Sequence, residues 1–263
     1  MIITSSMSAA HALEPPPRRT GTVRIASVDV EWTKNYRVKN GRRPFCYSVA
    51  WLDLPTSHTA DLADVPFDWT SVYVEEPDET DPLIRHAARA VAVAERTADI
   101  VTGHQFCADL SVLEANAPAD ARPALQRARE RWRQRREAVT QDGGRYVDPR
   151  YDAGHLLTGT SRRLVDVCTE LGLDVTQPEL RRTSMPAWHR RWIETGGPEG
   201  RERVSVLNLR HSLSTAYVAA LNEGLVRRPE PGLNVNRSLA LGARGAWAWL
   251  DDPTFTTLLE EDP

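Results

Sequence analysis

The segment SVDVE at residues 27–31, within the longer run VRIASVDVEW at residues 23–32, decides the fold that we expect for this chain. The run is rich in β-branched residues, which predicts a strand. Because successive side chains of a strand point to opposite faces of its sheet, Asp29 and Glu31 share one face. Neighbouring carboxylates repel each other unless one is protonated or a cation bridges them, and Mg²⁺ and Mn²⁺ take oxygen ligands of this kind. A solvated strand face is the alternative explanation of the same pattern.

Two more segments continue the sheet. Residues 45–54 (FCYSVAWLDL) and 71–75 (SVYVE) are again rich in β-branched and aromatic residues. The tripeptide KNG at residues 39–41 provides a hairpin-type turn before the first of them. Three consecutive strands of this kind predict an antiparallel meander.

Helices and two short strands follow the meander. Apolar residues at helical spacing predict a helix over residues 82–98, and a short strand over 99–102 ends at Gly103. We expect the remaining elements as two helices, a strand, a helix and a long amphipathic helix, over residues 108–115, 121–138, 146–148, 162–171 and 201–222. This order predicts an α/β fold with a mixed five-stranded sheet flanked by helices.

The two ends of the chain are expected to add little to the sheet. Residues 1–21 contain a PPP run and no apolar periodicity, which predicts a disordered N-terminal segment. Residues 236–250 predict a final helix that carries Trp247 and Trp249. The expected organisation is one domain over residues 22–224 and a C-terminal helical extension over residues 225–263.

Composition restricts the class of protein. Of 263 residues, 41% are hydrophobic and 26% are charged, which is typical of a globular chain with a core. The formal net charge of -3 gives no general attraction to nucleic acid, so such binding would need local patches. The sequence contains neither a run of about 18 apolar residues nor a secretory signal. We therefore expect a cytoplasmic protein without a membrane partner, whose three cysteines are reduced.

Arginines gather in two segments. Residues 122–137 contain seven arginines and two glutamates, and residues 181–192 (RRTSMPAWHRRW) interleave arginine with tryptophan. Both segments are candidates for contact with a nucleic-acid backbone. The arginines of the first segment spread around a helix, which favours a solvated surface, and core packing explains the tryptophans of the second equally well.

A second acidic motif begins where the strand over residues 99–102 ends. In GHQFCAD, residues 103–109, a glycine lets the chain turn and Asp109 falls in the first turn of the next helix. The helix dipole favours an acid there, so a purely structural role is the alternative.

Together, the two motifs resemble the DEDD superfamily of 3'-to-5' exonucleases, whose proofreading members have a ribonuclease H-like fold. The resemblance spans residues 23–224. The Asp-x-Glu of the family's first strand corresponds to Asp29 and Glu31, and its Gly-His-Asn motif with a later Asp corresponds to Gly103, His104, Gln105 and Asp109, with Gln in place of Asn.

The third motif of the family is incomplete in this chain. Some members place a histidine five residues before the last metal-binding Asp, and His211 lies in the corresponding helix, but position 216 is alanine. Three of the four carboxylates therefore remain. Asp148, Asp152 and Asp166 are nearby in the expected fold, although no motif assigns any of them to the vacant role.

The resemblance implies a two-metal site for Mg²⁺ or Mn²⁺ and a role for each residue. Asp29 would bridge both ions, Glu31 would hold the ion on the nucleophile side, and Asp109 would hold the other. His211 would accept a proton from the attacking water. The residues expected to contact nucleic acid are Trp32, Thr33, His104 and Gln105, and Trp32 could stack on a terminal base.

The implied activity is metal-dependent hydrolysis of phosphodiester bonds from the 3' end of DNA or RNA. One alternative, prompted by Ala216, is a degenerate domain that binds nucleic acid or a protein partner without cleaving. Another is endonuclease action of the ribonuclease H or Holliday-junction type, which fits the Gly-His-Gln motif and the spacing to Asp109 less well.

Overall fold

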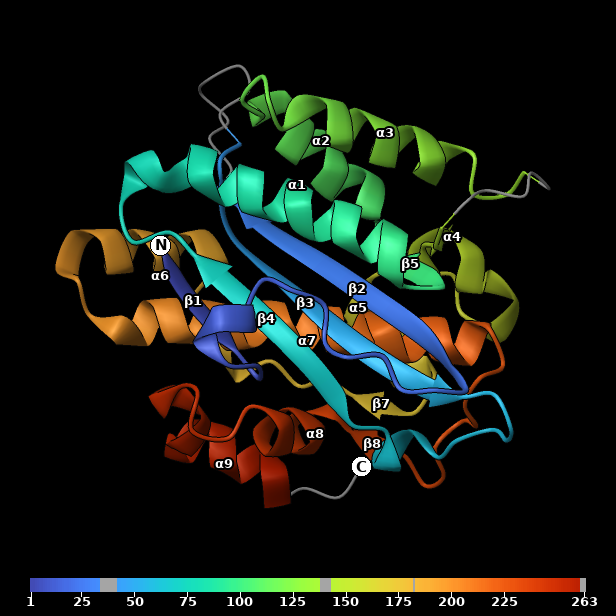
Figure 1. Cartoon of the computed structure of the whole chain (residues 1–263). Helices are drawn as coiled ribbons and strands as arrows, with labels where there is room; N and C mark the ends of the chain where they lie inside the picture. The colour runs from blue at the N-terminus through green and yellow to red at the C-terminus, as the bar shows by residue number, and fades with distance from the viewer. Residues whose placement is uncertain (34–41, 138–142, 182, 261–263) are drawn as a thin grey trace.

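A mixed six-stranded sheet lies at the centre of the molecule (Figure 1). The computed structural model describes residues 1–33, 42–137, 143–181 and 183–260, so the turn predicted at residues 39–41 lies outside the described residues. Along the sheet the strands are β1 (Ile2–Ser5), β4 (Phe67–Tyr73), β3 (Pro44–Pro55), β2 (Thr22–Trp32), β5 (Ile100–Thr102) and β6 (Arg145–Val147). Strands β2, β3 and β4 pair antiparallel, whereas β5 runs parallel to β2 and β6 parallel to β5. The α/β class, the mixed sheet and the meander are confirmed.

The sixth strand corrects the expectation of disorder at the N-terminus and the strand count of five. Residues Ile2–Ser5 form β1, which pairs antiparallel with β4 from Ile2 opposite Tyr73 to Ser5 opposite Thr70. An open sheet edge presents unpaired backbone N–H and C=O groups, and any short extended segment that reaches it can satisfy them. A further contact fixes the segment after β1, because the Thr70 hydroxyl donates to the carbonyl of Ala12 at 2.6 Å.

The two faces of the sheet carry separate apolar cores. Val28 and Val30 of β2 pack in one core with residues from three helices, whereas Ile25 lies in the opposite core. Helices α1 (Thr80–Thr97), α2 (Phe106–Asn116) and α3 (Arg122–Arg133) cover the first face, and α7 (Pro198–Asn222) crosses the second (Figure 1). The alternation along β2 therefore turns Asp29 and Glu31 toward α7, and their shared face agrees with the strand period.

Smaller elements surround α7. The helices are α4 (Pro149–Asp152), α5 (Leu164–Glu170), α6 (Met185–Thr195), α8 (Val235–Gly242) and α9 (Pro253–Glu260), and β7 (Leu173–Asp174) pairs parallel with β8 (Leu233–Asn234). Short 3-10 turns lie between the other elements, at Ala9–His11, Leu62–Asp64, Pro77–Glu79, Ala153–Leu156, Pro178–Leu180 and Ala248–Asp251. Within the described ranges, no helix combines the length and apolarity needed to cross a membrane.

The predicted final helix over residues 236–250 is wrong. Helix α8 ends at Gly242, Gly245 has a φ of 75°, and the chain then forms a 3-10 turn and α9. A left-handed residue interrupts helical hydrogen bonding and is easiest for glycine. The turn brings Trp247 to Trp69, with ring centroids 4.8 Å apart, so this tryptophan contributes to the core on the α7 face.

Candidate functional site

Strand β5 is short, so the part of β2 that carries the two acids is not paired with β5. The parallel pairing of β2 with β5 stops at Ser27 opposite Thr102, so Asp29 and Glu31 lie beyond the paired region. The chain that leaves β5 at Gly103 therefore turns beside the acidic end of β2. Both carboxylates are only slightly accessible, with side-chain exposures of 14% for Asp29 and 12% for Glu31.

The turn after β5 is held by Asp148 rather than by its own side chains. Gln105, which precedes α2, has a left-handed φ of 61°. The Asp148 carboxylate accepts hydrogen bonds from the backbone N–H groups of Gln105 and Phe106, both at 2.9 Å, and from the Trp132 indole at 3.0 Å. These bonds satisfy donors that a helix start leaves unpaired. Asp148 therefore fixes the start of α2 and with it the position of Asp109.

Asp109 does not act as a helix cap. Its side chain is buried, with 4% exposure, and it accepts no hydrogen bond from any described residue. Burial raises the pKa of Asp109 well above its ordinary value, and repulsion from Asp29, Glu31 and Asp148 adds to the increase. A carboxyl group in this state favours either a proton or a cation beside it.

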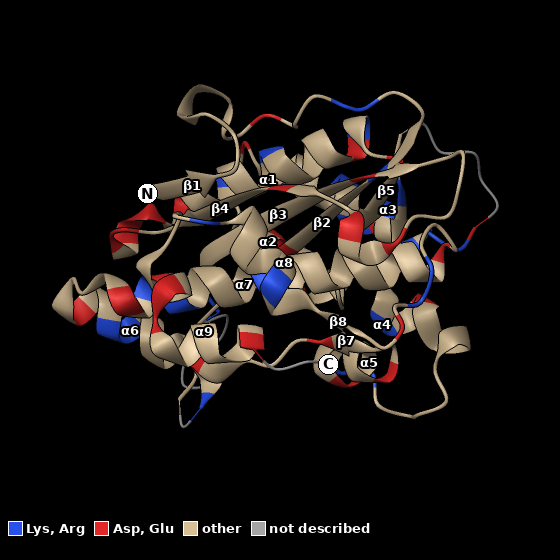
Figure 2. Cartoon of the chain, turned by 90° about the horizontal axis from the view of Figure 1, so that it is seen from below, with Lys and Arg blue, Asp and Glu red and all other residues tan. Residues whose placement is uncertain are grey.

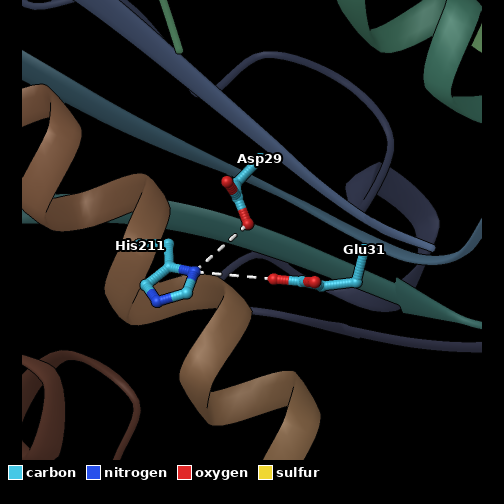
Figure 3. A group of neighbouring side chains, drawn as sticks. All are labelled: Asp29, Glu31 and His211. Atoms are coloured by element: carbon cyan, nitrogen blue, oxygen red, sulfur yellow. Dashed lines mark ion pairs between the residues drawn. The ribbon is translucent and has the colours of Figure 1, made fainter. Parts of the chain in front are cut away.

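His211 of α7 faces both acids of β2 (Figure 3). Its Nδ1 lies 3.6 Å from a carboxylate oxygen of Asp29 and 3.5 Å from one of Glu31. Burial alone would lower the pKa of His211, but the two carboxylates outweigh it and raise the pKa to about 10. Burial also raises the pKa of Glu31, partly offset by its contact with His211. The ligand atoms of the three residues all lie within 4.8 Å of one another.

Two neutral side chains that we did not predict complete this cluster. Asn208 Nδ2 donates to Asp29 at 2.5 Å, and Gln177 Nε2 lies 3.0 Å from His211 Nε2. Asn208 precedes His211 by three residues, which places both on one helix face, so helical spacing could have identified it. Gln177 lies between β7 and the Pro178–Leu180 turn, where no local pattern points to the site.

The structure also shows how the third motif differs from the family pattern. Ala216 is fully buried in the apolar core on the α7 face and presents no polar group. None of the three alternative acids has a free carboxylate: Asp148 holds α2, Asp152 pairs with Arg135 at 2.9 Å, and Asp166 accepts from Ser161 at 2.5 Å. From α7, the groups that reach Asp29 are the amide of Asn208 and the imidazole of His211.

A cleft of about 770 Å³ joins the acidic residues to most of the predicted nucleic-acid contacts. Its described lining includes Asp29, Glu31 and Asp109, together with the predicted contacts Trp32, His104 and Gln105, and also Arg42 and residues 183–186 at the start of α6. Arg42 was not predicted and adds a positive charge beside the acids.

Two of the predicted contacts have other partners in the structure. Thr33 is not among the described lining residues; its N–H donates to the carbonyl of Arg43 at 2.9 Å and extends the pairing of β2 with β3. His104 donates from Nε2 to the carbonyl of Arg162 at 2.9 Å, and burial lowers its pKa to about 4. His104 is therefore a neutral turn residue at neutral pH.

The arginine-rich segments are largely engaged within the protein. Arg129 pairs with Glu114 at 2.6 Å, and Arg135 and Arg136 both pair with Asp152. Figure 2 shows basic and acidic segments intermixed along α6, and the tryptophans of that helix donate to backbone carbonyls of the core. The structure thus favours the solvated helix and the packed surface over two phosphate-binding patches.

Comparison with known proteins adds nothing to this geometry. No model of a known protein family matches the chain, and no curated protein sequence is similar to it.

Proposed function

We propose that this protein is a metal-dependent nuclease of the ribonuclease H-like class that removes nucleotides from the 3' end of DNA or RNA. The observation that carries the proposal is the convergence of Asp29, Glu31 and Asp109, from β2 and α2, on one cleft. Carboxylates with little access to solvent that line one cleft repel one another unless a cation or protons neutralise them.

The residues present suit divalent metal ions. Asp109 is buried and accepts no hydrogen bond from the residues that the structure describes, and all three acids offer the oxygen ligands that Mg²⁺ and Mn²⁺ accept. Asp29, Glu31 and Asp109 would hold the ions, and Asn208 keeps the Asp29 carboxylate in place. When bound, such ions activate water and stabilise the charge that develops on the leaving oxygen.

The topology of the sheet supports the fold assignment within this proposal. The five predicted strands β2 to β6 form a meander followed by two parallel strands, and the acids lie on the central strand β2. Helices cover both faces, as the resemblance implies (Figure 1).

The size of the cleft is compatible with binding of a chain end. Its volume of about 770 Å³ falls in the range of pockets that bind small ligands. Trp32 offers an aromatic surface for a terminal base, and Arg42 offers a guanidinium group to a phosphate.

The test is degradation of a single strand of DNA or RNA, labelled at its 5' end, with Mn²⁺ or Mg²⁺. We expect progressive shortening from the 3' end, which D29N abolishes. The matched control D64N changes an exposed acid on a 3-10 turn away from the cleft and should leave the rate unchanged. Cleavage of a circular strand would instead favour an endonuclease.

One observation favours the non-cleaving alternative. A protonated His211 between Asp29 and Glu31 could neutralise the acids in place of a metal ion. In that case the wild-type protein would bind the labelled strand but leave it intact with either metal, and D29N would behave as the wild type does in the cleavage assay.

A further inference from the structure

We propose that His211 is itself a metal ligand through Nδ1, and that the site therefore prefers a first-row transition ion such as Mn²⁺ to Mg²⁺. The inference rests on the metal site of the proposed function and changes the role of this histidine from proton acceptor to ligand. It also explains how the cleft compensates for alanine at position 216.

The geometry on the acidic side of the imidazole is that of a shared ligand set. Nδ1 and one carboxylate oxygen from each of Asp29 and Glu31 lie within 4.8 Å of one another, and the ring edge points between the two acids (Figure 3). One ion placed among these atoms would contact one nitrogen and two oxygens. A proton on Nδ1 competes with the ion for this position.

The opposite side of the ring has the partner that a ligating histidine needs. A metal-bound imidazole usually donates its other N–H to an oxygen, which fixes the tautomer. The Gln177 carboxamide lies 3.0 Å from Nε2, and such a group presents either a donor or an acceptor according to its rotation. With the amide oxygen toward Nε2–H, the lone pair of Nδ1 faces Asp29 and Glu31. Gln177 is then a positioning residue.

A third acid also favours binding of a cation near Asp29 and Glu31. Asp109 lines the same cleft, is 4% exposed and accepts no hydrogen bond from the described residues. Its repulsion with Asp29 and Glu31 would be relieved by a cation near them. The ion pairs of His211 are with the two acids of β2. A protonated His211 would therefore leave Asp109 to be neutralised by an ion.

The chemistry of the donor set determines the preference. Mg²⁺ binds oxygen ligands and water, whereas imidazole nitrogen suits first-row transition ions, whose affinity for one site is lowest for Mn²⁺ and higher for Zn²⁺. Replacing a carboxylate by a neutral imidazole also removes a negative charge, which weakens Mg²⁺ binding most. We therefore expect the affinity of the site to increase from Mg²⁺ to Mn²⁺ and from Mn²⁺ to Zn²⁺.

The experiment measures binding and coordination without turnover. The full-length protein, freed of metal, is titrated with Mn²⁺ and Mg²⁺ by calorimetry, and bound Mn²⁺ is examined by pulsed electron paramagnetic resonance. The wild type should bind Mn²⁺ more tightly and show nitrogen hyperfine coupling from a directly bound imidazole. H211Q should lose the coupling and bind Mn²⁺ more weakly, and Q177L should weaken Mn²⁺ binding by about 10-fold. H155Q, at an exposed histidine outside the cleft, is the matched control and should keep both.

The outcomes separate this inference from the proposed function. Wild-type protein that binds Mn²⁺ without nitrogen coupling would overturn the role of His211 while leaving the metal site intact. Absence of binding by either ion would overturn both. The wild-type spectrum decides the question even if H211Q does not fold.

Discussion

At the scale of single residues, the electrostatic environment of His211 is set by its contacts with Asp29 and Glu31. Its imidazole is buried against two carboxylates, which raise its pKa from 6.5 to about 10. The folded protein therefore keeps a proton that the unfolded chain releases above about pH 6.5. The stability contributed by this proton is complete below that pH and is lost as the pH rises toward 10.

The raised pKa of His211 predicts that the metal-free protein becomes less stable as the pH rises. Between pH 7 and pH 9 we expect the free energy of unfolding to decrease by about 2 kcal/mol, measured by urea denaturation. The raised pKa values of Asp109 and of the N-terminal amine act in the same direction. H211Q should make the decrease in the free energy of unfolding with pH smaller, and H155Q should leave that decrease unchanged. Saturating Mn²⁺ should also make the decrease smaller, because the ion replaces the proton; a fall in H211Q as steep as that of the wild type would contradict the assignment.

At the same scale, the strand period was enough to place Asp29 and Glu31 on one face of the sheet, whereas the approach of Asp109 to them was expected only from the family resemblance. Asn208 shares a helix face with His211 and was accessible to the same reasoning. Gln177 and Arg42 were not, because their approach depends on how separate segments pack, and no local pattern encodes that packing.

At the scale of elements, the site depends on where strands and helices begin and end. β5 stops opposite Ser27, and α2 begins at a backbone turn that Asp148 holds from the next strand. The sequence predicted both elements within a few residues, since apolar periodicity marks them. It did not predict that Asp148 holds this turn, because the acid and the turn lie far apart along the chain.

Substitution of Asp148 tests this dependence. D148A removes the acceptor for the N–H groups of Gln105 and Phe106, the Trp132 indole and the N–H of Arg150. Buried donors left without an acceptor, added to the loss of a cap, should decrease the free energy of unfolding by about 3 kcal/mol or more. Metal affinity should also fall, because Asp109 lies in the first turn of α2.

The matched variant D61A, which removes the cap of an exposed 3-10 turn, should decrease the free energy of unfolding by at most about 1 kcal/mol. An equal effect of the two would contradict the role of Asp148.

At the scale of the whole molecule, a buried ionic network joins the C-terminal segment to the helix of the site. Arg210, adjacent to His211, binds Glu179 through both terminal nitrogens at 2.8 and 2.7 Å and donates to Asn236 at 2.7 Å. Glu179 also accepts from the Trp249 indole at 3.0 Å. Neither charged side chain is accessible to solvent. Such a network specifies one arrangement of α7, α8 and the turn at Ala248–Asp251.

Two errors in the expected fold arose at this same scale. β1 was missed because its stability comes from the free edge of β4 and not from its own four residues. The final helix was predicted as continuous over residues 236–250, whereas the chain breaks at Gly245 and Trp247 packs against Trp69. In both cases the observed local structure includes a contact with a residue distant in sequence.

The network predicts that residues 225–260 unfold together with the rest of the chain. E179Q would leave Arg210 as a buried charge without its partner, which should decrease the free energy of unfolding by about 3–5 kcal/mol while urea denaturation keeps a single transition. The double variant E179L/R210M removes both charges and should regain much of that loss, since an apolar pair avoids the desolvation penalty. The exposed pair Arg85 and Asp120 supplies the control, because D120N should leave the free energy of unfolding nearly unchanged. Separate transitions for the sheet and the C-terminal segment, or an E179Q effect as small as that of D120N, would show that the segment is only attached to the domain and does not hold α7 in place.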